Sequence, residues 1–404
     1  SLSNLTDEQM RHAKSGQWWE NNAQRALANN SVNYKEKPDI GTFMREWLAL
    51  YDSKSGERGI YNSSSAQRQV EKLNVGDQIR RAPRDDFGTN PCSEIILRSR
   101  ETCNLSEVVV RKDDILESLK DKVAVATILG TLQSTLTNYK YLSKEWKMNC
   151  EEERLLGVSL TGIMDNPLMN GSKGHDVLKS ALEELKKVAV DTNKEWAEKL
   201  GINQSAAITC VKPSGTVSQL VDSASGIHAR HNPYYIRTVR ADNKDPLCRF
   251  MIDAGFPNEP DVMKPQHTTV FSFPMKSPDD AIFRYDMTAI EQMELWKIYQ
   301  EHWCEHKPSV TISVKEHEWM EVGAWVYDNF DNISGISFLP FSEHTYRQAP
   351  YQDCTKEEYE EFLTKMPESV DWSKLSEYEE QDYTAGSQTL ACSGDSCEVV
   401  DLVA

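Results

Sequence analysis

The chain has 404 residues, long enough for a large hydrophobic core in two or three domains or in one large α/β barrel. Hydrophobic residues make up 39% and charged residues 27%, a balance that excludes a disordered chain. The net charge of -18 repels a nucleic-acid backbone, so we expect no nucleic-acid polymer as a partner, and any phosphate must be held by a local group of residues.

The sequence contains no run of about 20 apolar residues that could span a bilayer, and its start has no apolar signal segment. We therefore expect no membrane partner and a cytoplasmic location. The nine cysteines are an odd number in such a chain, so they do not predict a disulfide framework. The chain begins with Ser rather than Met, which suggests a trimmed tag or an internal cut.

Hydrophobic periodicity predicts three long helices and six short strands. The helices are expected over residues 122–142, 176–200 and about 288–305. In the first of these, the side chains expected to face the core are Val125, Ile128, Leu129, Leu132, Leu136 and Tyr139. β-branched runs predict strands at residues 106–111, 205–211, 234–240, 268–273, 309–314 and 334–339. Short strands alternating with long helices predict an α/β protein with largely parallel strands.

From Asp353 onward the composition becomes acidic, and it ends in a Gly/Ser-rich stretch that contains Cys392 and Cys397. Such a composition is typical of a mobile tail rather than a packed domain. We therefore expect a catalytic region over residues 1–352 and a separate C-terminal region over residues 353–404.

The segment NPCSEI places Cys92 two residues before Glu94, so in an extended loop both side chains point to the same side. A carboxylate disfavours the thiolate form of a nearby thiol, so the pair suits a hydrogen-atom donor better than a nucleophile. Glu94 is then free to take a proton from a substrate, and Asn90 is able to hydrogen-bond to substrate hydroxyls. For a lone Cys and Glu, a buried loop cysteine beside a solvated or helix-capping Glu is the favoured alternative.

Two further segments suggest ligand contacts. Cys103 stands where a loop enters a predicted strand, a place for reactive groups in α/β folds, although taken alone it is favoured as a core residue. The segment TCVKPSGTVSQL reads as a strand, a turn and a helix start, with Ser214 and Thr216 as candidate caps. Gly215 allows close approach of a ligand, and free N–H groups at the helix start favour an anion such as phosphate. An ordinary capped turn is an equal alternative.

The tail segment CSGDSC separates Cys392 from Cys397 by four residues. Two thiols on a mobile arm can form a disulfide and exchange it with other thiols, as a dithiol shuttle requires. Half of a zinc site is a rival interpretation, but no second Cys/His pair lies nearby, so we expect no metal ligands. A regulatory disulfide stays open.

Taken together, several segments resemble the C-terminal half of the large chain of a ribonucleotide reductase. They are NPCSEI, TCNLSEVVV, TCVKPSGTVSQL, GIHARHNPYYIRTVR, SVTISV, SGISFLP and CSGDSC. The forms NPCSEI, KPSGT and CSGDSC are most similar to the adenosylcobalamin-dependent (class II) members, and among these to the monomeric ribonucleoside-triphosphate reductases. No glycyl-radical loop is visible, and Tyr234 and Tyr235 follow the phosphate loop too closely to be the tyrosine relay of the diiron class.

This resemblance implies a fold, a reaction and a cofactor. The fold would be the C-terminal half of the family's ten-stranded α/β barrel, with a finger loop near residues 89–95 and a flexible C-terminal tail. The reaction would be radical-based reduction of ribonucleotides to deoxyribonucleotides, with triphosphates as the favoured substrates. The cofactor would be adenosylcobalamin, which the family associates with the part of the chain that includes residues 270–278.

The resemblance also implies a role for each matching residue. Cys92 would become a thiyl radical that abstracts the 3′ hydrogen of the ribose, Glu94 would deprotonate the 3′ hydroxyl, and Asn90 would bind the substrate hydroxyls. Cys103 would be one of two thiols that reduce the 2′ position. Cys392 and Cys397 would reload the site and then be reduced by thioredoxin or a similar dithiol. The residues implied for the substrate phosphates are Ser214, Gly215, Thr216 and Val217.

One departure from the family's pattern predicts a partner. The family's other reducing cysteine and its effector region lie N-terminal to the part that this chain resembles, and Cys210 is a poor substitute on a predicted core strand. We therefore favour a split subunit that works with an N-terminal-half partner over an excised fragment. Two other functions stay open: a non-catalytic nucleotide-binding relative, and a dithiol exchange protein acting through its C-terminal cysteine pair.

Overall fold

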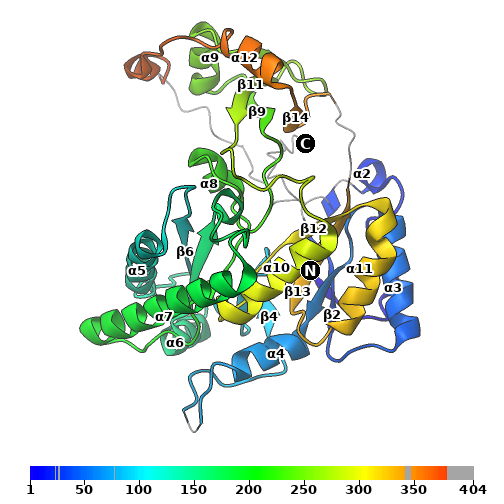
Figure 1. The fold of residues 1–404 in the computed structure, drawn as a ribbon, viewed down its shortest axis with the longest axis vertical. Helices are drawn as coiled ribbons and strands as arrows, with labels where there is room; N and C mark the ends of the chain where they lie inside the picture. Colours follow the sequence, from blue (N-terminus) through cyan, green and yellow to red (C-terminus); the bar gives the residue numbers. More distant parts are fainter. Residues whose placement is uncertain (23, 26–27, 77, 342–346, 380–404) are drawn as a thin grey trace. The chain divides into compact units, whose positions relative to one another are not determined.

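The computed structural model describes residues 1–379 except 23, 26–27, 77 and 342–346. These residues form two compact units, one of residues 1–229 and 280–341 and one of residues 230–279 and 347–379 (Figure 1). The boundary expected after residue 352 falls inside the second unit, where a short strand spans it. Within the described part of the chain, no helix combines the length and apolar character needed to cross a membrane.

The first unit is built on five parallel strands. They are β6 (Asn104–Val109), β7 (Leu156–Thr161), β8 (Thr209–Cys210), β12 (Thr311–Val314) and β13 (Gly335–Pro340). β6, β7 and β8 pair in parallel, as do β12 and β13, and a bridge between Val211 and Pro308 joins the two groups. The sequence predicts four of these strands. It misses β7, in which all six residues are buried.

Three more strands extend this half-barrel. They are β1 (Leu2–Ser3), β2 (Ser31–Tyr34) and β3 (Gly59–Asn62), which are parallel to one another. β3 pairs antiparallel with β13, so the strand order runs β1-β2-β3-β13-β12-β8-β7-β6. The sequence does not predict these strands, because segments of two to four residues are too short to show a period. Within the described residues, the order ends at β1 on one side and at β6 on the other.

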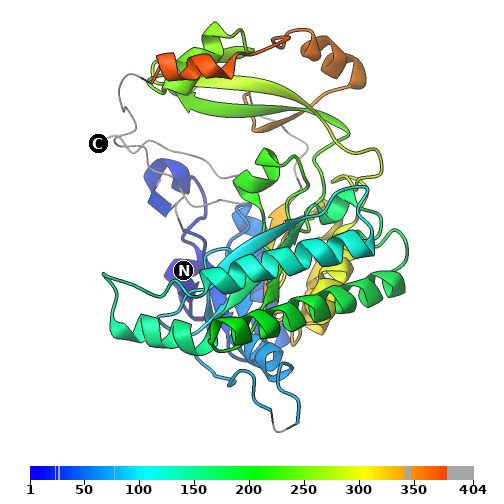
Figure 2. The same ribbon diagram turned by 90° about the vertical axis from the view of Figure 1, so that its left-hand side faces the viewer.

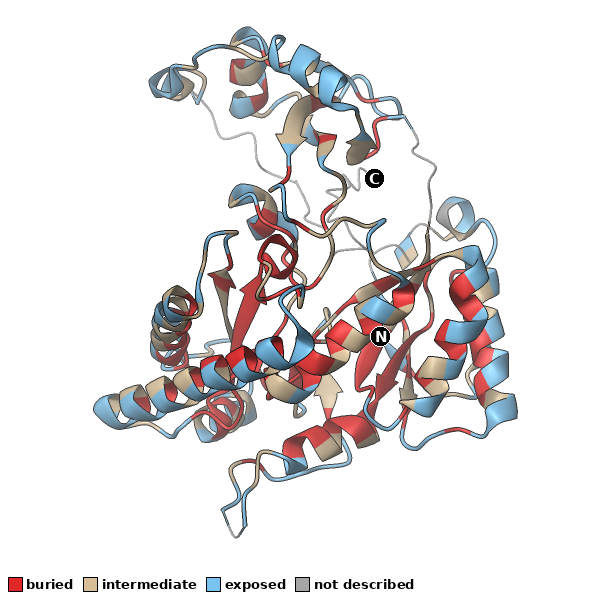
Figure 3. Ribbon diagram, viewed as in Figure 1, coloured by how far each residue is buried: buried red, intermediate tan, exposed pale blue. Residues whose placement is uncertain are grey.

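A layer of helices packs against these strands. α5 (Leu116–Gln133) follows β6 and lies beside α7 (His175–Leu200), which follows β7 (Figure 2). α10 (Ala289–His302) contacts α7 and β12, and α11 (Trp319–Asp328) contacts α3 (Ile40–Ser53). Buried residues concentrate on the strands and on the helix faces turned toward them, which places the core between the two layers (Figure 3). The three helices expected from the sequence correspond to α5, α7 and α10.

The face that the sequence predicts for α5 is wrong. Val125, Leu129, Leu132 and Leu136, here called the α5 stripe, are between 40% and 72% exposed. The helix buries another stripe instead, which consists of Leu119, Val123, Ala126, Thr127, Gly130 and Thr131. The small residues of that stripe let α5 approach the sheet closely, because a Cβ on Gly130 would lie only 3.4 Å from Leu156 of β7. Periodicity alone does not show which of two such faces has a neighbour.

The second unit has a different architecture, a four-stranded antiparallel sheet in the order β10-β11-β9-β14. Its strands are β9 (Tyr234–Asp242), β10 (Asn258–Pro260), β11 (Thr268–Lys276) and β14 (Tyr351–Asp353). Two of the six predicted strands are β9 and β11, but their antiparallel pairing contradicts the expected parallel arrangement. Only the short helix α9 (Pro246–Asp253) and β10 connect them, without the long crossover that parallel neighbours need. α12 (Lys356–Leu363) contacts both strands, so the region expected as a tail begins with ordered structure.

The remaining elements are short. They are α1 (Glu8–Arg11), α2 (Trp18–Asn21), α4 (Ser63–Glu71), β4 (Gly88–Thr89), β5 (Ile96–Leu97), α6 (Lys144–Glu153), α8 (Gly215–Leu220) and the 3-10 turns at Ile163–Asp165, Glu316–Glu318 and Trp372–Glu377. β4 and β5 pair antiparallel and enclose the predicted finger loop.

Candidate active site

The finger loop is anchored at both ends by residues from distant parts of the chain. At its start, the Tyr61 hydroxyl on β3 donates hydrogen bonds to the carbonyls of Phe87 at 2.9 Å and Gly88 at 3.0 Å. At its end, the Ile96 N–H donates to Nδ1 of His306 at 3.3 Å. Burial lowers the pKa of His306 well below its usual range, so the ring is neutral and can accept this bond. The loop is therefore held between β3 and the segment that precedes β12.

Asn90 and Glu94 contact each other across the loop. Asn90 Nδ2 donates to Glu94 Oε1 at 2.6 Å, and Asn90 Oδ1 accepts from the Ile95 N–H at 3.1 Å. Between them stands Cys92, which is half-buried and whose carbonyl accepts a hydrogen bond from the Ser309 hydroxyl. The structure thus brings the predicted residues Asn90, Cys92 and Glu94 together in one tight turn.

The Glu94 carboxylate is fully buried, and its two oxygens have different environments. Oε1 accepts from Asn90 and from Nζ of Lys212, the latter at 3.1 Å. Oε2 is buried and has no hydrogen-bond partner among the described residues. A buried acceptor without a donor is costly, so Oε2 is the position at which a ligand hydroxyl would be stabilised.

Sequence reasoning missed Lys212, which comes directly after the bridge residue Val211. Its Nζ binds Glu94 and also hydrogen-bonds to the Cys92 side chain. Burial disfavours the ammonium, but the charge of Glu94 and the hydrogen bonds that Nζ makes outweigh burial and raise the pKa of Lys212 to about 12. The signal in the sequence is a lysine at the end of a predicted strand, beside the predicted phosphate loop. It supplies the cation that a buried carboxylate needs.

Cys103 directly precedes β6 and is half-buried against Leu155, Ala206 and Ala207. Burial and the charge of Glu94 raise the pKa of Cys103 to about 12, so its thiol is protonated at neutral pH. Cys210 is fully buried on β8, as expected for a core cysteine, and burial raises its pKa as well.

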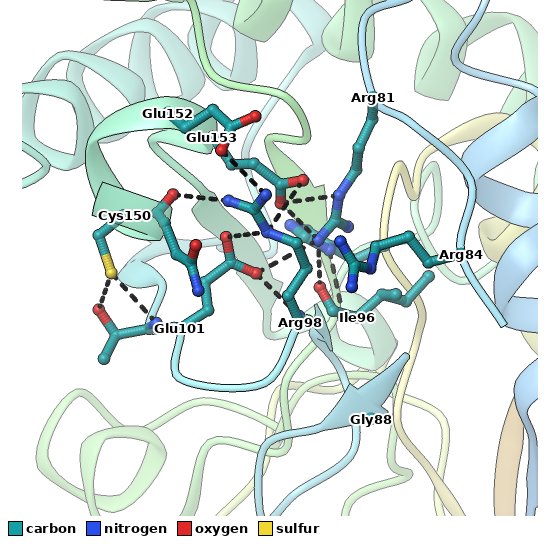
Figure 4. A network of polar contacts seen from close by, with 12 residues as sticks. Arg81, Arg84, Gly88, Ile96, Arg98, Glu101, Cys150, Glu152 and Glu153 are labelled. Carbon is teal, nitrogen blue, oxygen red and sulfur yellow. Dashed lines mark hydrogen bonds and ion pairs between the residues drawn. The ribbon is translucent and has the colours of Figure 1, made fainter. Parts of the chain in front are cut away.

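A buried network of ion pairs fixes the chain between the finger loop and Cys103 (Figure 4). Arg81 pairs with Glu153 at 2.7 Å and Glu101 at 3.5 Å, and Arg98 pairs with the same two carboxylates at 3.4 and 3.3 Å. Arg81 also donates to the Ile96 carbonyl at 2.9 Å. Because Ile96 ends the finger loop and Glu101 lies two residues before Cys103, the network holds both parts of the site in place.

The predicted phosphate loop has the expected turn followed by α8, and Ser214 stands at the N-cap position as predicted, but without a side-chain cap bond. The Ser214 hydroxyl does not cap the helix; it donates to the carboxylate of Glu107 on β6. Burial raises the pKa of Glu107, so this carboxylate is more readily protonated than an exposed one. Gly215, Thr216 and Val217 in the first turn of α8 are exposed and accessible to a ligand.

The predicted dithiol, Cys392 and Cys397, lies outside the described residues. Within residues 1–379, leaving out the stated gaps, no cluster of His, Cys, Asp and Glu side chains has an arrangement that could hold a metal ion.

Comparison with known proteins identifies relatives by sequence, although no family model matches the chain. Three of these relatives are named adenosylcobalamin-dependent ribonucleoside-triphosphate reductase. The one from Euglena gracilis is 31% identical over 313 residues, which cover 77% of this chain and 42% of the relative. Those from Lactobacillus delbrueckii and Lacticaseibacillus paracasei are 28% and 27% identical, covering 85% and 93% of this chain and 50% and 53% of the relatives. This chain therefore spans about half the length of the curated relatives that it matches.

Solved structures share the fold. A crystal structure of a B12-dependent (class II) ribonucleotide reductase aligns with a TM-score of 0.77 and 23% identity, over 94% of this chain and 55% of that one. The class Id ribonucleotide reductase alpha subunit of Actinobacillus ureae aligns with a TM-score of 0.54 and 12% identity, over 84% of this chain and 70% of that one. At these identities the likeness concerns the fold alone. It confirms the α/β class and the half-barrel predicted from the sequence.

Proposed function

This chain is homologous to the adenosylcobalamin-dependent (class II) ribonucleotide reductases, and we propose that it supplies the radical-bearing part of such an enzyme. The proposed reaction reduces a ribonucleotide to a deoxyribonucleotide, with a triphosphate favoured because the relatives are named triphosphate reductases. The observation that carries the proposal is the turn in which Cys92 stands between Asn90 and Glu94, where one carboxylate oxygen of Glu94 has no hydrogen-bond partner in the described part of the chain.

In the proposed reaction the finger-loop residues act on the 3′ position of the ribose. The Cys92 sulfur, as a thiyl radical, abstracts the 3′ hydrogen, and Glu94 accepts the proton of the 3′ hydroxyl at Oε2. Asn90 and Lys212 hold the other oxygen of Glu94, so its orientation is set before substrate binds. At the end of the cycle, Cys92 returns its hydrogen to the 3′ carbon and is regenerated as a radical.

Cys103 acts at the 2′ position. The 2′ hydroxyl leaves as water, and the two electrons come from Cys103 and a second thiol, which join in a disulfide. A thiol with a raised pKa remains protonated until the reaction and so delivers hydrogen together with its electron. Cys392 and Cys397 are then proposed to reduce this disulfide by thiol exchange and to be reduced in turn by thioredoxin or a similar dithiol.

Adenosylcobalamin, when bound, supplies the hydrogen-atom acceptor that converts the Cys92 thiol into a radical. The described residues fit such a group, because the Cys92 side chain is partly exposed and can be approached by a bulky cofactor. A corrin ring brings its cobalt already coordinated, so the chain needs no set of metal-binding side chains. Residues 270–278, most of them on β11, are the segment proposed to contact it.

Substrate phosphates are proposed to bind at the first turn of α8. Gly215, Thr216 and Val217 are exposed there, and their N–H groups have no side-chain cap. The Ser214 hydroxyl now donates a hydrogen bond to Glu107. Ser214 is therefore proposed to bind phosphate through its backbone, or through its hydroxyl once that bond to Glu107 is broken.

A partner carrying the N-terminal half is proposed to complete the site. Two features of the first unit support this. β6, which follows Cys103 directly, is an edge strand within the described residues, and unpaired edge strands are usually covered. The α5 stripe is an exposed apolar row on the helix that packs against β6 and, with Leu136, just beyond its end, and such rows mark interaction surfaces. A strand beside β6, followed by a helix on the α5 stripe, would cover both and place a second thiol near Cys103.

The test is reconstitution of the full chain with a candidate N-terminal half, adenosylcobalamin, a ribonucleoside triphosphate and a dithiol. We expect deoxynucleotide formation and a cobalt(II)–thiyl signal in electron-spin resonance. Both should vanish in Cys92→Ala and persist in Cys354→Ala, a matched variant of a half-buried cysteine in the second unit. Product formation by Cys92→Ala, or silence of the wild-type mixture, would contradict the proposal.

The dithiol-exchange alternative makes a different prediction for the same mixture. If the chain acted only through Cys392 and Cys397, truncation after residue 379 would abolish all reduction. A reductase instead retains turnover with a small dithiol and loses only the thioredoxin-supported rate.

A further inference from the structure

A lysine is buried against the finger loop. Lys307 lies in the segment before β12, and its side chain is fully buried. Its Nζ donates a hydrogen bond to the Ser93 hydroxyl at 2.8 Å and lies 4.7 Å from the centre of the Tyr61 ring. It forms no ion pair with any described residue, so Ser93 is its polar partner. Lysine is rarely buried in this way, because its charge is costly to desolvate.

Gly335, the first residue of β13, packs directly against this amine. A Cβ built on Gly335 would lie 2.7 Å from Lys307 Nζ and 2.8 Å from Ser93 Oγ, so only glycine leaves room for their hydrogen bond. The backbone of Lys307 also contacts the loop: its N–H donates a hydrogen bond to the Glu94 carbonyl at 3.1 Å. A change of the lysine side chain therefore leaves this backbone contact available.

The conformation of the finger loop depends on the backbone of Ser93. Its φ of +68° lies in the left-handed region that non-glycine residues seldom adopt, and its N–H closes the turn onto the Asn90 carbonyl at 2.9 Å. It stands between Cys92 and Glu94, so rotation of its peptide would redirect both side chains. A residue that fixes Ser93 fixes the geometry of the radical site.

We propose that Lys307 is a positioning residue of the finger loop: its amine holds Ser93 in the left-handed conformation and thereby sets where Cys92 and Glu94 point. The consequence for catalysis rests on the proposed function, whereas the geometric claim does not. Burial lowers the pKa of Lys307 to about 7, against the opposing charge of Glu94. The amine can donate to Ser93 in both its charged and its neutral form, so the contact persists across this pH range.

The first test measures the reactivity of Cys92 without turnover. The full chain is treated with iodoacetamide, and the alkylation rate of Cys92 is followed by peptide mass spectrometry for wild type, Ser93→Ala, Lys307→Met and the double variant. We expect each single variant to change the rate by about three- to tenfold and the double variant to add little, since both remove one interaction. Gly335→Ala, which displaces the same two groups, should change the rate in the same direction.

The controls separate positioning from general loosening. Cys354, in the second unit, should react at an unchanged rate in every variant. Lys297→Met removes a half-buried lysine that bonds Asn329 instead of the finger loop, and it should leave Cys92 unaffected. Unchanged reactivity of Cys92 in Ser93→Ala and Lys307→Met, or additive effects in the double variant, would overturn the proposal. Ser93→Ala keeps the proposal testable even if Lys307→Met fails to fold.

The second test uses the reconstituted enzyme and distinguishes the two proposals. Lys307→Met should lower kcat by about tenfold or more while KM for the nucleotide changes by less than about twofold, because substrate contacts remain while the reacting groups are misplaced. If Ser93→Ala and Lys307→Met have non-additive effects on the alkylation rate of Cys92 but the wild type has no turnover, the reductase function is refuted and the positioning role stands. Turnover that depends on Cys92 but not on Lys307 would refute the positioning role alone.

Discussion

Lys212 Nζ lies 3.1 Å from Glu94 Oε1, so a lysine at the end of one strand neutralises the buried carboxylate of the finger loop. This pairing gives a fully buried glutamate a cationic partner next to a thiol. It also leaves Oε2 facing no protein donor among the described residues, and this is the oxygen proposed to accept the proton of a substrate hydroxyl. The cation therefore holds the carboxylate in place and, in the proposed reaction, orients Glu94 as the proton acceptor.

Replacing this lysine should destabilise the fold and the site together. Lys212→Met leaves Glu94 buried without its cation, and removing one partner of a buried ion pair typically costs about 3 kcal/mol of unfolding free energy. Urea unfolding followed by circular dichroism measures this change. Lys187→Met, which removes an exposed pair with Asp191, should unfold at nearly the wild-type midpoint. Equal midpoints for both variants would show that Lys212 does not carry the proposed role.

The buried network around Arg81 predicts a defect that depends on pH. Arg81→Met leaves Glu101 and Glu153 close together without one of their two cations. Burial and Glu153 already raise the pKa of Glu101, and loss of Arg81 would raise it further. A raised carboxyl pKa gives stability at low pH that is lost as pH rises through the folded value. The variant should therefore be most destabilised near pH 8 and recover toward wild type near pH 5, as thermal melts at both pH values would show.

Matched melts of Arg84→Met provide the control for this network. Arg84 pairs with Asp86 on the surface, so its loss should be small at both pH values. A defect of Arg81→Met that stayed constant from pH 5 to pH 8 would assign it to lost packing instead of unpaired carboxylates.

Lys307 predicts a second dependence on pH, which comes from a lowered amine pKa instead of a raised carboxyl pKa. Its pKa is about 7 in the folded chain against an ordinary value of 10.5, so the unfolded chain binds more protons between these values. The stability contributed by this group is present above pH 10.5 and is lost as pH falls toward 7. The difference in unfolding free energy between wild type and Lys307→Met should therefore rise with pH from 7 to 10, by up to about 1.4 kcal/mol per pH unit. Urea unfolding at pH 7, 8.5 and 10 tests this, and a flat difference would contradict the lowered pKa.

The parts of the site that sequence could predict are those that one short segment contains. Asn90, Cys92 and Glu94 fall within five residues, so their types and spacing already indicate a thiol beside a carboxylate. Lys212 and Lys307 meet this loop from 118 and 214 residues further along the chain. Lys212 is marked only by its place at the end of a predicted strand, and nothing in the local pattern distinguishes Lys307 from a surface lysine. Their roles depend on strand order, which the fold alone supplies.

The elements of the fold likewise divide into those that the local sequence pattern predicts and those that it does not. α7 was predictable because Leu178, Leu182 and Leu185 repeat at helical spacing and are all buried. β1, β2 and β3 were not, because each is too short for a period. For α5 the helix was predictable but its buried face was not. Small residues such as Gly130 and Thr131 pack against the sheet there, while larger apolar residues face outward.

The last prediction concerns the α5 stripe. An exposed apolar row of this kind is expected to be covered by another segment. Leu129→Glu combined with Leu136→Glu places charges at positions that are 58% and 72% exposed, so folding should be unchanged. Binding of the N-terminal half should weaken by at least about tenfold, since two apolar contacts are replaced by buried charges. Isothermal titration calorimetry with the separate N-terminal half measures this affinity.

A matched double variant tests whether the effect belongs to the stripe. Val177→Glu with Met320→Glu changes two apolar residues of similar exposure, 51% and 74%, on α7 and α11. Its affinity for the N-terminal half should equal that of wild type. If instead sedimentation velocity showed wild type as a dimer that only the stripe variant dissociates, with no change in binding the N-terminal half, the stripe would be a contact between copies of this chain. Equal losses in both double variants would point to a general charge effect, because the net charge of -18 is then made more negative in either case.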